Sequence, residues 1–133
     1  MNPPDNRRLP VSPKEWLIHA ESDLKFGKLG MANGDILCHQ ICFHAQQAAE
    51  KAFKAVLLSK GIDFPLTHDI QELLDIIEEG GLVLSLDILD SSSLTPYAVE
   101  ARYPGYWGNI TQKEVEEAIE LAQKVVTWAQ NEI

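Results

Sequence analysis

Residues 35–61 form the longest stretch of the chain without proline or an internal glycine, and nearly every residue in it is compatible with a helix. At 100° per residue its apolar side chains fall into two groups. The broad group is Cys38, Ile41, Cys42, Ala45, Ala48, Ala49, Ala52, Phe53 and Val56, and a narrower group on the other side is Ile36, Phe43, Leu57 and Leu58. A helix that is apolar on two faces must be covered on both. We therefore expect a central helix, capped by Asp35 and ended by Gly61, whose face bearing Ile36, Phe43 and Leu57 is left for a second copy or a partner.

The rest of the chain carries the start and stop signals of further helices. Ser12-Pro13-Lys14-Glu15 is a capping box with proline at the first helical position, and Thr111 with Glu114 forms a second box. Between them, Thr67 or Asp69 can cap a short helix that Gly80-Gly81 ends, and we favour a helix over 82–94 because no partner strand exists. These signals predict an all-α, antiparallel up-and-down bundle of about five helices over 12–133, preceded by a flexible, proline-rich arm over 1–11.

Composition limits the functions open to the chain. With 20 acidic and 11 basic residues its net charge is −9, so its overall field repels phosphate backbones and makes nucleic acid an unlikely general partner. Two cysteines one helical turn apart do not form a secreted disulfide framework, and no apolar run approaches the length of a membrane span. We therefore expect a cytoplasmic protein without a membrane segment.

Two groups of residues could be taken for metal sites. Cys38, His39, Cys42 and His44 lie close in sequence, but on a helix the thiols point into the predicted core and His44 points elsewhere, so buried thiols and surface histidines are the favoured interpretation. His68-Asp69 also occurs in metal-dependent phosphohydrolases, whereas a helix start with Asp69 near the positive end of the dipole explains it more simply. We expect no metal site.

Two other stretches are candidates for ligand binding. Gln46, Gln47, Glu50 and Lys54 make a polar strip that is either solvated, with an i, i+4 pair between Glu50 and Lys54, or lines a groove. Residues 97–107 hold all three tyrosines, a tryptophan and the only arginine outside 1–11. Arg102 with Tyr97 and Tyr103 could hold a phosphate and stack a base, or this loop could simply pack over the end of the bundle.

Several of these residues together resemble the HEPN domain family. The similar pieces are FHAQQAAEKA at 43–52 with KAVL at 54–57, then Gly61 and Pro65, HDI at 68–70, Leu73-Leu74, and Tyr97 with VEARYP at 99–104. They cover about residues 15–130. The resemblance implies a helical bundle that is usually a homodimer and is often encoded beside a minimal nucleotidyltransferase with which it works.

The same resemblance bears on activity. Many relatives are RNases that use an arginine followed after four to six residues by a histidine; Arg102 matches the arginine, but Trp107, Gly108 and Asn109 occupy the histidine positions. Without that general base, the expectation is a nucleotide-binding or substrate-presenting module at Arg102, Tyr97, Tyr103, Gln46, Glu50 and Lys54. No cofactor is required, and a nucleotide with magnesium is a possible ligand. The alternatives are an RNA-cleaving toxin in which His44 or His68 replaces the missing histidine, and a purely structural dimerisation or partner-holding protein.

Overall fold

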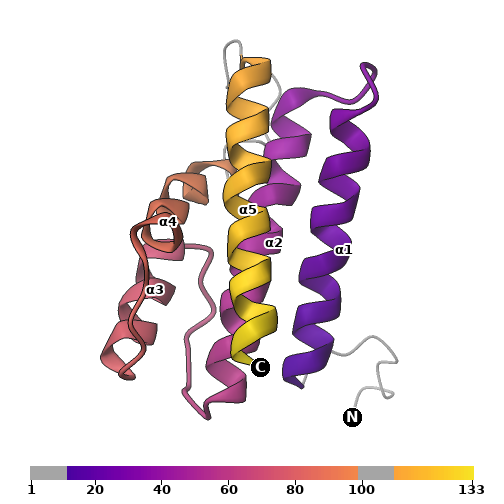
Figure 1. Ribbon diagram of the computed structural model, residues 1–133. Helices are drawn as coiled ribbons and strands as arrows, with labels where there is room; N and C mark the ends of the chain where they lie inside the picture. Colours follow the sequence, from indigo (N-terminus) through magenta and orange to yellow (C-terminus); the bar gives the residue numbers. More distant parts are fainter. Residues whose placement is uncertain (1–11, 99–109) are drawn as a thin grey trace, which may run out of the picture.

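The computed structural model describes residues 12–98 and 110–133, and within them all regular structure is helical. Three long helices, α1 (Pro13–Met31), α2 (Cys38–Ser59) and α5 (Gln112–Glu132), lie side by side. The shorter α3 (Ile70–Glu79), α4 (Leu86–Leu89) and the 3-10 helix η1 (Asp90–Ala98) pack on one flank of this group (Figure 1). The predicted all-α bundle of about five helices is confirmed.

The direction of the helices follows from the short segments that join them. α1 and α2 form a hairpin, and α3, α4 and η1 carry the chain back so that α5 runs in the same direction as α2 (Figure 1). Gln130 bonds Glu21 at 2.7 Å and Lys28 bonds Gln123, so seven residues on α1 match seven on α5 in the opposite order. α1 therefore begins at the end of the bundle where α5 finishes.

Most of the predicted helix ends are confirmed. Ser12 accepts from the backbone N–H of Glu15, Thr111 accepts from that of Glu114, and Asp69 caps α3 by accepting from Gln71. Gly61, which follows α2, has φ of 70°, a left-handed conformation that glycine adopts at little cost. Each of these signals is local, which explains why sequence alone located them.

Two predicted boundaries are wrong. Asp35 does not cap α2, because the Asn33 side chain organises that turn by accepting from the Asp35 N–H, and the helix starts three residues later without a side-chain cap. The predicted helix over 82–94 starts only at residue 86. Before it, Val83 is exposed while Leu84 is buried, and this alternation is the pattern of an extended segment.

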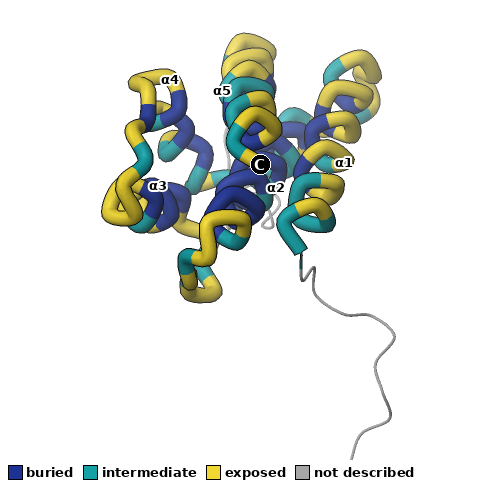
Figure 2. Tube along the Cα trace, turned by 60° about the horizontal axis from the view of Figure 1, so that its bottom comes forward, coloured by how far each residue is buried: buried dark blue, intermediate teal, exposed yellow. Residues whose placement is uncertain are grey.

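α2 occupies the centre of the molecule, and Figure 2 shows it buried along most of its length. Its broad apolar face packs against α1 and α5, as predicted, and the rest of its surface is largely covered by α3, η1 and the segment before α3. Among the described residues, no helix is long and apolar enough to cross a membrane.

Candidate functional site

The polar strip of α2 is buried rather than solvated. Gln46, Glu50 and Lys54 are 0%, 3% and 5% exposed, and only Gln47 among the four predicted strip residues is half-exposed. They are buried because α2 is covered on more sides than a peripheral helix would be. Charged side chains are rarely so deeply buried without partners. Glu50 and Lys54 are therefore expected to be paired.

Glu50 is the centre of the first group of contacts. Its Oε2 accepts from Lys54 Nζ at 2.9 Å, its Oε1 accepts from Gln46 Nε2 at 3.0 Å, and Oε1 also lies 2.8 Å from His68 Nδ1. The predicted i, i+4 pair is thus confirmed, and it belongs to a larger network. Trp16 of α1 covers its far end, because Lys54 Nζ lies 5.5 Å from the centre of the Trp16 ring.

Asp23 of α1 is the centre of a second group with the same composition. Its Oδ2 accepts from Lys51 Nζ at 2.7 Å, and its Oδ1 lies 3.1 Å from His44 Nδ1. The His44 ring also stacks on Phe26 at a centroid distance of 4.4 Å, so this histidine is half-buried and not the surface histidine that was predicted. Each of the two carboxylates therefore holds one lysine and one histidine.

The Asp23 group lies on the side of α2 that α5 leaves uncovered, whereas Glu50 lies about 60° around the helix from Phe53, closer to the α5 side. Phe53 of α2 packs against Trp128 of α5, and at 100° per residue Gln47 and Lys51 lie more than 100° around the helix from Phe53. Gln47 Nε2 bonds Gln46 Oε1 at 2.6 Å and so joins the strip to this side. We call His44, Lys51, Lys54 and His68, with Asp23 and Glu50, the α2 cation cluster.

The cluster concentrates hydrogen-bond donors in an acidic protein. Two lysines and two histidines share two carboxylates, so the cluster carries no net negative charge. An ammonium has three N–H donors, and the Asp23 carboxylate takes only one from Lys51. Such a group can accept an anion at its exposed edge, where Lys51 and His68 are 24% and 55% exposed at their side chains.

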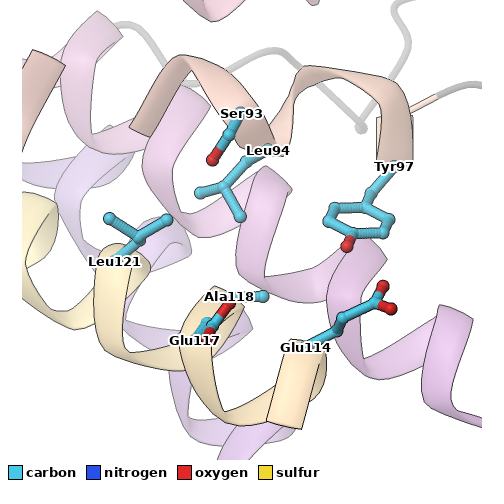
Figure 3. A pocket seen from close by; sticks show the side chains of 7 residues that line it. All are labelled: Ser93, Leu94, Tyr97, Glu114, Glu117, Ala118 and Leu121. Carbon is cyan, nitrogen blue, oxygen red and sulfur yellow. The ribbon is translucent and has the colours of Figure 1, made fainter. Parts of the chain in front are cut away.

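Tyr97 lies beside Cys42, towards the start of α2, in different surroundings. It lines a cavity of about 190 Å³ between η1 and α5, where Figure 3 shows it facing Glu114 with Glu117 nearby. Burial, followed by the neighbouring Cys42 and Glu114, raises the pKa of Tyr97 to about 12. The carboxylates of Glu114 and Glu117 at this cavity disfavour a phosphate beside Tyr97.

Burial likewise raises the pKa of Cys42 from 9.0 to about 12, in spite of the hydrogen bond to Tyr97 that lowers it. The folded chain therefore holds both protons more tightly than the unfolded chain. We expect the free energy of unfolding to be insensitive to these groups below pH 9.0 and to fall as pH rises from there towards 12. Urea titrations across this range should show a shallower fall for Cys42→Ala than for the wild type, and equal slopes would contradict the prediction.

The remaining predicted residues have separate places. Arg102 and Tyr103 lie outside the described residues. Ile36 and Phe43 are half-buried near the surface of the α1–α2 hairpin, whereas Leu57 has no exposed surface and lies in the core, so its predicted role at a partner face is wrong. α2 turns Leu57 under the covering segments that precede and form α3. Within 12–98 and 110–133, no three His, Cys, Asp or Glu side chains are placed to hold a metal ion.

Sequence reasoning missed four members of the cluster, because Lys51 was not considered and His44 was interpreted only as a surface histidine or a substitute base. His68 was considered only as part of a helix start or as a substitute base, and Asp23 was not considered. His68 lies 18 residues from Glu50 in the sequence, and Asp23 lies 21 residues from His44 and 28 from Lys51. No local pattern indicates pairs so far apart. The signal for such partners is the burial of Glu50, whose second oxygen needs a donor once Lys54 has taken the first, and this burial is visible only in the fold.

The comparisons with known proteins identify the fold family. The sequence model of the HEPN domain matches residues 13–133, nearly the whole chain. The chain belongs to the HEPN domain family. No curated protein matches it.

Solved structures agree with this membership. The crystal structure of TT1696 from Thermus thermophilus is similar with a TM-score of 0.80 and 29% identity, covering 93% of this chain and 100% of that one. An archaeal HEPN homologue, ST0689, has a TM-score of 0.72 and 27% identity over 90% of this chain and 96% of its own. An HEPN domain protein from Thermotoga maritima shares the fold, with a TM-score of 0.54 and 21% identity over 90% and 91%.

Proposed function

We propose that this HEPN domain is a binding module that holds a nucleotide for a partner minimal nucleotidyltransferase. The observation that supports it is the α2 cation cluster, which gathers two lysines and two histidines around two carboxylates in a chain of net charge −9. Lys51 and His68 offer donors at its edge to phosphate oxygens, and magnesium could accompany the phosphates. Arg102, which lies outside the described residues, is the further phosphate-binding group that the sequence suggests.

Thermal unfolding with nucleoside mono-, di- and triphosphates and magnesium tests this proposal. A nucleotide at 100 times its dissociation constant adds about 2.7 kcal/mol of stability, which raises the midpoint by several degrees. We expect one nucleotide to give this shift in the wild type, and Lys51→Ala and Arg102→Ala to lose most of it. Lys124→Ala, which removes a lysine of α5 paired with Asp87 and Glu120, is the matched control and should keep the shift. No shift with any nucleotide would contradict the proposal.

A second candidate function is RNA cleavage, and the geometry of the histidines favours it. His44 and His68 each face a carboxylate through Nδ1. An ionised carboxylate only accepts, so Nδ1 donates and Nε2 is left as the acceptor that a general base needs. His68 is the more accessible of the two.

If His68 is the base, His68→Gln should lower the cleavage of single-stranded or structured RNA by about 100-fold or more, while His19→Gln should not. His19 is an exposed histidine of α1. Absence of cleavage by the wild type at micromolar protein would remove this candidate.

The proposed module also needs a surface for its partner, or for the second copy of a homodimer. Phe26, Leu29 and Leu37 are 53%, 63% and 56% exposed, and Phe26 and Leu29 line a hollow of about 180 Å³ with Ile36. We define the hairpin patch as Phe26, Leu29, Ile36, Leu37 and Phe43. Exposed apolar surface gathered in one place is typical of protein interfaces.

Placing a charge in the hairpin patch should therefore prevent self-association. We expect Leu29→Glu to convert a dimer into monomers with the same helix content, because a buried interface charge without a partner is costly. Light scattering measures the mass, and Leu66→Glu, at a strongly exposed leucine far along the sequence, is the control. A dimer that survives Leu29→Glu would place the interface elsewhere.

A further inference from the structure

A groove separate from the α2 cation cluster lies between α4 and the last turns of α5. Its volume is about 400 Å³; Ile88 and Trp128 give it an apolar floor, and Ser85, Thr127 and Asn131 contribute to a polar rim. Val83 and Leu86 beside it in sequence are 95% and 78% exposed. A groove with apolar residues and a polar rim can hold an apolar side chain of another segment.

The charges at this groove are the reverse of those in the α2 cation cluster. Lys124 lies 3.7 Å from Asp87 and 3.3 Å from Glu120, so two carboxylates share a single lysine. The Asp87 and Glu120 side chains are 66% and 67% exposed. The rim is therefore negative, and it suits a segment that combines basic residues with an apolar one.

The residues before Ser12 contain a segment with this composition. Arg7 and Arg8 are two of its three arginines, and they are followed directly by Leu9, Pro10 and Val11. Two guanidinium groups match two exposed carboxylates, and a leucine next to them matches an apolar floor of Ile88 and Trp128. Proline favours an extended backbone, as a groove between two helices requires.

The length of chain between Leu9 and α1 decides whether this segment can bind the groove of its own molecule or only that of another copy. In the α1–α5 register, Thr127 in the groove is level with Leu24, which lies 12 residues from Ser12, or about 18 Å along the axis. Leu9 precedes Ser12 by three residues and can extend at most about 11 Å from it. Leu9 therefore cannot reach the groove of its own chain.

We infer that residues 7–11 of one copy bind in the α4–α5 groove of a second copy. Arg7 and Arg8 pair with Asp87 and Glu120, and Leu9 packs on Trp128. This contact joins two different surfaces, so it is heterologous and can continue from copy to copy into a ring or an open chain. It is independent of the hairpin patch and of nucleotide binding.

A labelled peptide of residues 1–12 tests the contact by fluorescence anisotropy. The receptor is the full chain carrying Arg7→Glu and Arg8→Glu, so that its own segment does not compete. We expect saturable binding that weakens at least tenfold with Asp87→Arg and does not weaken with Glu116→Arg, an equal charge change at an exposed position of α5 outside the groove. A peptide with Leu9→Asp should bind at least tenfold more weakly.

Three results would overturn the inference. They are no binding at millimolar peptide, equal binding by the Asp87→Arg and Glu116→Arg receptors, and equal binding of the Leu9→Asp peptide. Binding that depends on Asp87 but not on Leu9 would mean that the rim attracts any basic segment, and the groove would then belong to a different basic partner. Each result can be read from the same titration.

Discussion

Replacing Glu50 with alanine is expected to lower the free energy of unfolding by about 3–5 kcal/mol, the usual cost of removing one partner from a buried ion pair. Lys54 would keep a positive charge at a site that is 5% exposed, and Gln46 would lose its acceptor. Since small domains have only about 5–15 kcal/mol of stability, this variant should melt roughly 10 to 20 °C below the wild type. Urea and thermal unfolding measure the loss directly.

Asp23→Ala is the natural control, because Asp23 also holds one lysine and one histidine. Its side chain is 15% exposed and those of His44 and Lys51 are 27% and 24% exposed, so water can solvate the lysine that remains. We expect a loss of about 1 kcal/mol, as for other accessible ion pairs. Equal losses in Glu50→Ala and Asp23→Ala would show that burial does not govern the cost.

The double variant Glu50→Met with Lys54→Met separates the worth of the pair from the cost of breaking it. Replacing both charges by apolar side chains of similar length leaves no unpaired charge in the protein interior, so most of the lost stability should return, apart from about 1–3 kcal/mol for the acceptor that the buried Gln46 loses. The same variant removes both groups from the proposed nucleotide site. A stable protein without a nucleotide-dependent shift would then mean that the pair is kept for binding and not for stability.

Local signals in the sequence were sufficient for most of the helices. The side chains of Ser12, Asp69 and Thr111 cap helices within three residues of their own positions, and an Ile70, Leu73, Leu74, Ile77 pattern defines a face without reference to distant residues. The prediction of a helix over 82–85 was wrong because the leucines of this short segment fit a helical and an extended pattern equally well. Packing of Leu84 into the core decided between them.

The site was harder to predict because burial depends on the whole bundle. Gln46, Glu50 and Lys54 have the spacing of a solvated strip, and only the covering of α2 from several sides makes them interior residues. The contact between His68 and Glu50 depends on how the segment before α3 crosses α2, which no residue spacing specifies. The sequence therefore indicated the polar residues of α2, and the tertiary fold brought Asp23 and His68 to them.

Leu57→Glu should abolish folding, and this is the second large effect that we expect. Leu57 has no exposed surface and belongs to the same core as Phe53 and Leu73. A carboxylate there would lose its hydration without gaining a partner, at a cost above the roughly 4 kcal/mol that marks exceptional substitutions. Circular dichroism and urea titration should show little cooperative unfolding.

Leu58→Glu and Phe43→Glu distinguish this core role from a role at an interface. Both positions are half-exposed on the same helix, so a glutamate there can reach water and the monomer should fold with a loss of about 1 kcal/mol or less. Phe43→Glu should in addition weaken the proposed dimer, since Phe43 belongs to the hairpin patch and Leu58 does not. If Leu57→Glu folds as a monomer, Leu57 lies at the partner face and not in the core. A charge at an interface residue prevents association and leaves the fold of the monomer intact.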